Sequence, residues 1–124
     1  MTYRLSVHDG FAAAHRLTGS GGKCESLHGH NFRVTLEVTG DQLDGSGMLM
    51  DFGDLKKTLR TVLEELDHSD LNEHRVLSVS GPSSENIARF IWRAVNDMLD
   101  RNNVKVAAVT VNESDTASAR YEPE

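Results

Sequence analysis

The alternation of apolar and polar residues along the chain predicts four strands. Apolar side chains occupy odd-numbered positions over residues 3–17 and even-numbered positions over residues 30–39, the pattern of strands with one buried face. Shorter segments, 104–113 and 117–122, show the same alternation, with Ala107 in the apolar set of the first. Asp9-Gly10 interrupts the first strand, and we expect a bulge there.

Two further segments carry apolar residues at three- and four-residue spacing, which is typical of amphipathic helices. The first starts at Phe52 and can be capped by Asp51 or Asp54, whereas the second can be capped by Ser83 or Ser84. On the first helix we expect Lys56, Lys57 and Arg60 to cover the solvent-exposed side.

The order strand, strand, helix, helix, strand, strand predicts an α+β fold over residues 1–124, a single domain. Its core is a four-stranded antiparallel sheet with both helices on one face. The edges of so small a sheet need protection, so we expect subunits to assemble through strand pairing.

Three histidines fall on the predicted buried face of the first two strands. His15 shares the parity of the apolar residues before it, and His28 and His30 share the even parity of the second strand. A lone histidine in such a place is usually a hydrogen-bonded core residue, and an isolated His-x-His is usually an exposed turn. Three imidazoles aimed at one interior would be costly without a ligand, and three protein ligands suit a catalytic zinc ion.

Cys24 lies in a glycine-rich loop, residues 18–26, that is longer than a tight hairpin connection. A thiol near a metal or a cation has a lowered pKa and can act as a base or nucleophile, although a structural thiol is the alternative. Arg16 and Lys23 flank the same region and could bind phosphates, or could simply be solvated charges.

Two other groups could take part in proton transfer or in ring recognition. Asp67 and His68 could form an acid–base pair, but adjacent residues on a helix do not face each other, so their spacing alone favours a solvated helix end. Glu113 ends an apolar strand and could pair with a nitrogen-rich ring, or could be a surface charge. His8 and His74 have no supporting context and are expected at the surface.

Charge and cysteine content narrow the class of protein. Thirteen basic against nineteen acidic residues give a net charge of −6, which argues against a surface that coats nucleic acid. No apolar run approaches the ~20 residues of a membrane span, and no secretory signal is visible. A single cysteine fits a reducing, cytoplasmic setting.

Taken together, the motifs resemble the 6-pyruvoyl-tetrahydropterin synthase family over essentially the whole chain. Within that family they are most similar to the bacterial 6-carboxy-tetrahydropterin synthases of queuosine biosynthesis. The motifs are Phe11-Ala12-Ala13-Ala14-His15-Arg16, Cys24-Glu25-Ser26-Leu27-His28-Gly29-His30-Asn31, Met50-Asp51-Phe52, Leu66-Asp67-His68, Leu71-Asn72, Pro82-Ser83-Ser84-Glu85-Asn86 and Glu113.

The resemblance implies a T-fold whose subunits form a barrel as trimers and stack into a homohexamer, with active sites between subunits. It implies that His15, His28 and His30 hold zinc, that Cys24 abstracts a proton, and that Asp67 and His68 form a second proton relay. Glu113 would anchor the pterin ring. The implied substrate is dihydroneopterin triphosphate, and the implied products of this carbon–carbon lyase are 6-carboxy-tetrahydropterin, acetaldehyde and triphosphate.

One pair of residues leaves the product open. Family members with a glutamate three residues before His-Gly-His resemble folate-branch enzymes that make 6-hydroxymethyl-dihydropterin, and here Glu25 occupies that position beside Cys24. The resemblance therefore allows a dual-function enzyme, a carboxy-pterin synthase with an incidental glutamate, or a 6-pyruvoyl-tetrahydropterin synthase. A zinc- or pterin-binding protein without turnover is the alternative outside the enzymes.

Overall fold

Two long antiparallel strands form the centre of the fold. A computed structural model of the protein describes residues 2–19 and 21–123. Strands β1 (Tyr3–His15) and β2 (His28–Gly40) pair along their whole length, from Tyr3 opposite Gly40 to His15 opposite His28. The register is unbroken, so the predicted bulge at Asp9-Gly10 is wrong. Gly10 serves a different purpose, because a Cβ atom there would lie 2.8 Å from the Phe32 carbonyl oxygen.

The sheet of the described residues has five strands in the order β3-β1-β2-β4-β5. Strands β4 (Lys105–Ser114) and β5 (Ala117–Tyr121) extend it antiparallel on the β2 side. The additional strand, β3 (Ser69–Asp70), pairs parallel with β1. The predicted four-stranded antiparallel sheet is therefore corrected to a mixed one. A two-residue strand shows no alternation, so the sequence pattern could not indicate it.

The register of β4 also differs from the prediction. The pairing of β2 with β4 shifts between Glu37 and Val38, and the shift changes which side chains of β4 face the core. Val106 and Ala108 are buried, whereas Ala107 is only partly buried. Beyond the irregularity, Val109 and Val111 are buried as predicted.

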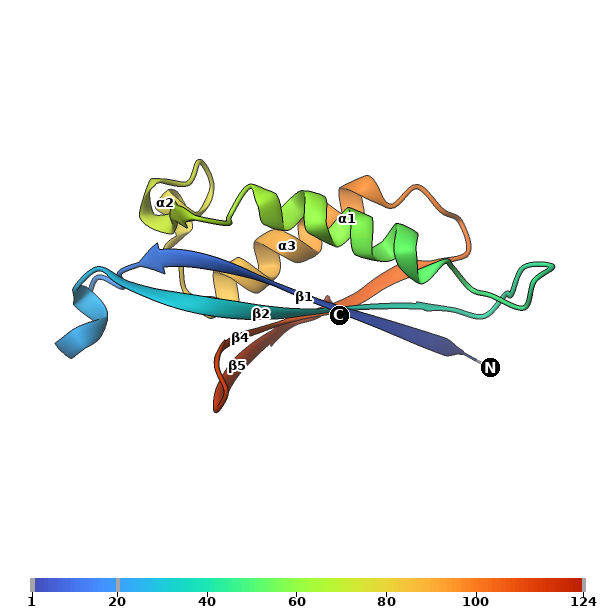
Figure 1. Cartoon of the computed structure of the whole chain (residues 1–124), viewed down its shortest axis with the longest axis horizontal. Coiled ribbons are helices and arrows are strands. Elements are labelled where there is room, and N and C mark those ends of the chain that lie inside the picture. The colour runs from blue at the N-terminus through green and yellow to red at the C-terminus, as the bar shows by residue number, and fades with distance from the viewer. Residues whose placement is uncertain (1, 20, 124) are drawn as a thin grey trace.

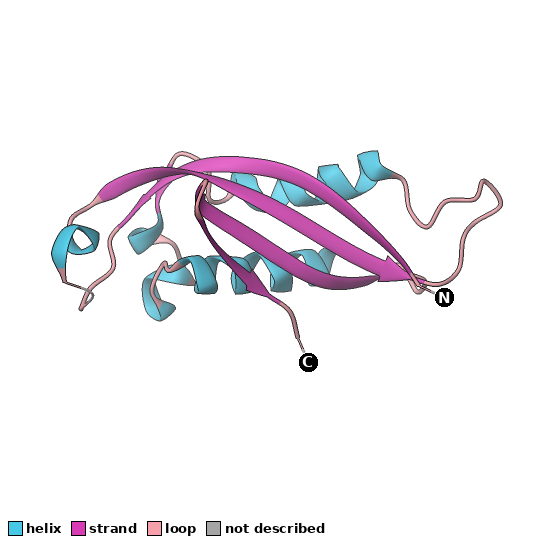
Figure 2. Ribbon diagram, turned by 90° about the horizontal axis from the view of Figure 1, so that it is seen from below, coloured by secondary structure: helices cyan, strands magenta, loops and turns pink. Residues whose placement is uncertain are grey.

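Both long helices cover the same face of the sheet, as Figures 1 and 2 show. Helix α1 (Phe52–Glu64) is capped by the Asp51 carboxylate, which accepts from Gly53 N at 2.6 Å. Helix α3 (Ser84–Met98) is capped by Ser83 Oγ, which accepts from Asn86 N at 3.2 Å. Their apolar stripes and the matching face of β1, β2 and β4 form one core.

The remaining elements are short and lie at one end of the sheet. They are the 3₁₀ turns η1 (Gly22–Glu25) and η2 (Leu71–Glu73) and the one-turn helix α2 (Leu77–Ser80). Figure 1 shows α2 and the β1–β2 connection at the same end, away from the N-terminus. Among the described residues, no helix is both long and apolar enough to span a bilayer.

Gly40 ends β2 where the chain from α3 to β4 passes close by. A Cβ atom there would lie 2.2 Å from the Asn103 carbonyl oxygen and 2.5 Å from Leu49 Cδ1. We predict that Gly40→Ala lowers the free energy of unfolding by roughly 1–3 kcal/mol, the usual cost of overpacking, as measured by urea denaturation. Gly45→Ala, with nothing within 4 Å, is the matched control. Equal stability of the two variants would contradict this account.

Candidate metal centre and active site

Three histidines and a glutamate converge at one end of the sheet. His15 ends β1, His28 and His30 begin β2, and Glu113 lies near the end of β4. The possible ligand atoms of these four side chains all lie within 4.8 Å of one another. The imidazole rings meet edge to face, with centroids 4.6 Å apart for His15 and His28 and 5.1 Å for His15 and His30. The group can hold a metal ion.

Backbone carbonyls fix the orientation of two of the rings. His15 Nδ1 lies 2.7 Å from the Pro82 carbonyl oxygen, and His28 Nδ1 lies 2.7 Å from that of Ser26. A carbonyl can only accept, so each Nδ1 carries the proton and each Nε2 keeps its lone pair. This is the arrangement in which metal-binding histidines are commonly held.

The fit to a metal ion rests on nitrogen atoms that nothing else in the described chain satisfies. His15 is fully buried, and its Nε2 has no hydrogen-bond partner. His30 Nε2 also makes no hydrogen bond, although it is 3.1 Å from Glu113 Oε1. Buried nitrogen acceptors without partners are costly. A cation bound between the rings would remove that cost, so the donor set fits a metal.

Electrostatics keep His30 in the form that binds metals. Burial lowers the pKa of His30, the Glu113 carboxylate opposes that shift, and the neighbouring rings of His15 and His28 reinforce it. The ring is therefore neutral at neutral pH, as a metal ligand must be. Glu113 is held in turn by Ser84, whose hydroxyl donates to Oε2 at 2.9 Å.

Glu113 lies beside His30, a neighbour that its sequence context did not indicate. This position is compatible with the expected role of Glu113 as a carboxylate that binds a ring. From there it also faces a surface hollow of about 450 Å³ that is lined in part by Ser84 and Arg120. Glu113 lies near the histidines because β4 pairs with β2. No local sequence pattern predicts which strands pair, so the sequence could not show this contact.

Asp67 and His68 do contact each other, contrary to what spacing on a helix predicts. Both follow the end of α1, and His68 has a positive φ of 57°, a conformation outside the helical range. His68 Nδ1 thereby comes within 3.1 Å of Asp67 Oδ1, which also accepts from Ala12 N at 2.9 Å. The Ala12 N–H lowers the pKa of Asp67 most, and His68 and Arg60 lower it further against partial desolvation.

The glycine-rich loop lies outside the histidine cluster. Cys24 is exposed in η1, and its carbonyl accepts from Leu17 N at 2.7 Å. Glu25 turns back along its own loop, so that its carboxylate lies near Gly21. Neither the thiol nor this carboxylate belongs to the group of possible metal ligands in the described part of the chain. Within a single chain, the structure does not bring them to the cluster.

The two basic residues that the sequence predicted to flank the site have exposed side chains. Lys23 lies in η1, and Arg16 directly follows β1. The Asn72 side chain binds the backbone of Arg16 twice, accepting from its N–H at 2.8 Å and donating to its carbonyl at 3.0 Å. Asn72 thus fixes the chain directly after His15. Its sequence position gave no sign of that role.

His74 is buried, which corrects its expected place at the surface. Its Nε2 contacts Glu65, and its Nδ1 accepts from Val76 N and Leu77 N at 3.1 and 3.2 Å. The ring therefore accepts hydrogen bonds from the backbone at the N-terminal end of α2, the helix that precedes Pro82. His8 is exposed as expected, and its ring bonds Thr35 Oγ1 on the opposite face of the sheet.

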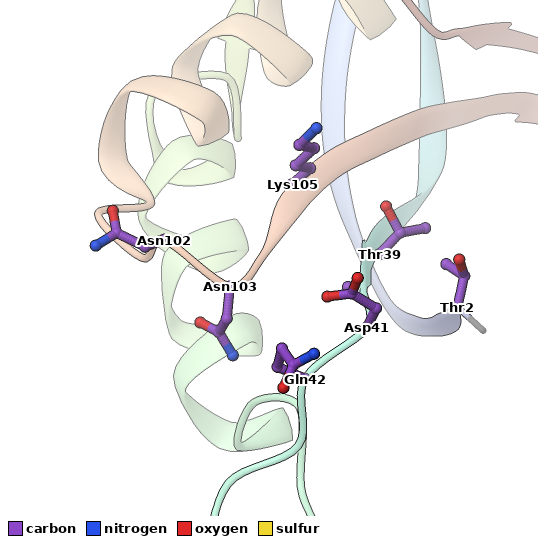
Figure 3. Close-up of a pocket in the computed structure, with 8 residues that line it drawn as sticks. Thr2, Thr39, Asp41, Gln42, Asn102, Asn103 and Lys105 are labelled. Carbon is purple, nitrogen blue, oxygen red and sulfur yellow. The ribbon is translucent and has the colours of Figure 1, made fainter.

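The hollows of the surface differ in the chemistry of their linings. His30 and His68 both line a hollow of about 470 Å³ together with Ala12, Ala14 and Gly29. At the other end of the sheet lies the hollow of Figure 3, about 440 Å³, whose lining is mainly threonine, asparagine and glutamine. Asp41 and Lys105 are its charged groups, and it has no histidine or cysteine. The reactive side chains thus gather at the histidine end.

The structure is that of an α+β domain with a group of side chains that can hold a metal ion at the end of its paired strands. Comparison with known proteins identifies its family. The family model described as 6-pyruvoyl tetrahydropterin synthase matches residues 4–124. The chain belongs to the 6-pyruvoyl tetrahydropterin synthase family. This is a family of pterin synthases, and membership supports an enzyme that acts on a pterin-type small molecule.

Individual relatives agree with this assignment. The 6-carboxy-5,6,7,8-tetrahydropterin synthase of Synechocystis is 38% identical over 116 residues, which are 90% of this chain and 86% of the relative. The 6-pyruvoyl tetrahydropterin synthase structure of Caenorhabditis elegans superimposes with a TM-score of 0.89 at 25% identity, covering 100% of this chain and 97% of that one. A Plasmodium vivax 6-pyruvoyltetrahydropterin synthase with a catalytic glutamate replaced by cysteine superimposes with a TM-score of 0.78 at 25% identity, covering 99% and 98%.

The cluster predicts that a divalent cation stabilises the folded chain. Zinc at one hundred times its Kd should raise the free energy of unfolding by about 2.7 kcal/mol, measured by denaturation with and without the ion. His28→Ala should abolish the effect, whereas His8→Ala, an exposed histidine on the other face, should keep it. Stabilisation should fade on acidification as the imidazoles protonate, and His30, with its lowered pKa, should protonate only below its ordinary value. Equal stabilisation of His28→Ala would contradict the site.

Proposed function

We propose that the protein is a zinc-dependent 6-carboxy-5,6,7,8-tetrahydropterin synthase. In this proposal it takes 7,8-dihydroneopterin 3′-triphosphate and water, and it releases 6-carboxy-tetrahydropterin, acetaldehyde and triphosphate. The observation that carries the proposal is the histidine cluster, which combines lone-pair nitrogens with an adjacent carboxylate in a chain of the pterin synthase family. The Synechocystis relative supports the carboxy-pterin product.

Zinc is the metal that we propose for this donor set. Three imidazole nitrogens leave a tetrahedral zinc ion one open position, which is the usual composition of a catalytic site. His15, His28 and His30 would hold it. When bound, zinc polarises an oxygen of the substrate side chain and acidifies the neighbouring C–H bonds.

The remaining roles fall to side chains around the cluster. Cys24 takes a proton from the substrate side chain, which requires its thiolate form. His68 passes a second proton through Nε2 while Asp67 stabilises the charged imidazole. Glu113 accepts two parallel hydrogen bonds from the amino-pyrimidine edge of the pterin, a geometry that selects this ring. Arg16 and Lys23 bind the triphosphate.

The separation of Cys24 from the histidine cluster supports an active site shared between subunits. Edge strands β3 and β5 leave backbone groups that a neighbouring chain can pair with. We infer a T-fold barrel of three chains and a hexamer made of two such barrels, in which a neighbour's elements complete each site. Light scattering coupled to gel filtration should then give six times the 13.7 kDa mass of one chain. A stable, fully active monomer would contradict this assembly.

Glu25 is the reason for considering a second product. The Plasmodium vivax protein has a catalytic glutamate in a 6-pyruvoyltetrahydropterin synthase, so a carboxylate serves as a catalytic group in at least one member of this family. In the present chain Glu25 would take that role in forming 6-hydroxymethyl-7,8-dihydropterin. A zinc- or pterin-binding protein without turnover remains the non-enzymatic alternative.

Product analysis distinguishes these functions. Zinc-loaded protein incubated with dihydroneopterin triphosphate should yield 6-carboxy-tetrahydropterin and acetaldehyde, identified by mass spectrometry. Cys24→Ala should lower kcat by about 10²–10⁴-fold, the usual contribution of a positioned base, while zinc content stays unchanged. Glu25→Gln is the matched control and should keep this activity.

Other outcomes assign the protein elsewhere. 6-Hydroxymethyl-dihydropterin that disappears in Glu25→Gln would place the protein in the folate branch, wholly or in part. A 6-pyruvoyl product would indicate the biopterin-type reaction. No turnover by protein with stoichiometric zinc would reject the enzymatic proposals for this substrate.

A further inference from the structure

Arg60 is the basic residue of α1 that turns toward the sheet. The sequence placed it on the solvent-exposed side with Lys56 and Lys57, which are indeed exposed. The Arg60 side chain is instead only 36% exposed. Its Nη1 donates to Asp9 Oδ1 at 3.1 Å and to the Gly10 carbonyl at 3.2 Å, so two acceptors on β1 fix the guanidinium plane.

The other end of that guanidinium faces Asp67. Arg60 Nη2 lies 3.8 Å from Asp67 Oδ2, and it is buried without a hydrogen-bond partner in the described chain. The two oxygens of Asp67 thus face different groups. Oδ1 meets Ala12 N and His68 Nδ1, whereas Oδ2 faces the cation. Only one orientation of the carboxylate keeps Oδ1 at Ala12 N and His68 Nδ1 and, at the same time, Oδ2 toward Arg60.

The backbone reinforces the same arrangement. His68 N donates to the Ala12 carbonyl at 2.6 Å, so Ala12 binds both residues of the pair through its own N–H and carbonyl. The His68 side chain nevertheless is 83% exposed, and its contact with Asp67 is the ring interaction that orients it. Anything that rotates the Asp67 carboxylate therefore releases the ring.

We propose that Arg60 is a positioning residue that sets the orientation and the tautomer of the His68 ring through Asp67. The fixed guanidinium faces Asp67 Oδ2 and holds the carboxylate so that its Oδ1 faces His68 Nδ1, which leaves Nε2 as the nitrogen that exchanges protons. The charged groups facing Asp67 are Arg60 from α1 and His68 beside it, while Asp9 of β1 offsets part of the Arg60 charge. The catalytic consequence rests on the proposed function, but the orientation of His68 does not.

A purely structural clamp between α1 and β1 is the competing role of Arg60. Such a clamp would affect the free energy of unfolding and leave the His68 ring unchanged. The two roles therefore differ in what substrate-free protein shows by NMR. ¹⁵N chemical shifts of the His68 imidazole report which nitrogen carries the proton, and a pH titration of the carboxyl signals gives the pKa of Asp67.

The test uses the zinc-loaded full chain and the variants Arg60→Gln, Arg60→Lys and Lys57→Gln. Removing a nearby cation stabilises the protonated carboxyl group, so Arg60→Gln should raise the pKa of Asp67 toward its ordinary value. The carboxylate would also lose its fixed orientation, so the Nδ1–H tautomer of His68 should become less populated. Arg60→Gln should lower kcat at least about tenfold, with little change in KM, because the whole relay contributes about 10²–10⁴-fold.

The other variants separate charge from geometry. Arg60→Lys keeps the positive charge but has a different donor geometry. The pKa of Asp67 should therefore stay low, while the Nδ1–H tautomer of His68 should be less populated than in the wild type. If Arg60→Gln does not fold, Arg60→Lys still decides the tautomer. Lys57→Gln should match the wild type in every measurement. Shifted His68 signals in a protein without turnover would support the positioning and reject the proposed function.

The result that overturns the proposal is equally direct. Arg60→Gln or Arg60→Lys with wild-type tautomer and titration curves, whatever its stability, would leave Arg60 as a structural clamp alone.

Discussion

The antiparallel pairing of β1 with β2 is the constraint on which the site depends. Thirteen residues of each strand pair without a shift, so that His15 lies opposite His28 and Ala13 opposite His30. Because side chains alternate along both strands, this register places three imidazoles on one face at the end of the core. A slip by one residue would move His28 and His30 to the opposite face. The same pairing buries Phe11 against Phe32, so core packing and site geometry favour one register.

The sequence was sufficient for features that depend on local periodicity. The two long helices, the four main strands and the shared face of the three histidines all follow from alternation or helical spacing. The sequence offered two candidate N-cap residues for each long helix, and in the structure the caps are Asp51 for α1 and Ser83 for α3. The order of the motifs also led to the family that the comparison then identified.

The features that the sequence did not predict depend on contacts between segments that are distant along the chain. β3 is too short to show a pattern, and it exists because the chain after α1 lies against β1. Glu113 reaches His30 only because β4 pairs with β2, and the ring of His74 contacts Glu65 before it and Phe90 after it in the chain. Asp67 and His68 were judged by helical spacing, although the chain has already left the helix at that point. In each case the deciding information is tertiary.

The acceptors that orient His15 and His28 have an evolutionary consequence. Both are main-chain carbonyls, of Pro82 and Ser26, and no point mutation can delete a main-chain carbonyl. The tautomers of these rings therefore depend on the path of the backbone at Ser26 and Pro82 and not on the chemistry of a partner side chain. Insertions or deletions near these two bends are the genetic changes that would disturb the rings. Lineages can thus drift in amino-acid sequence around the site while the histidines keep the same lone pairs directed inward.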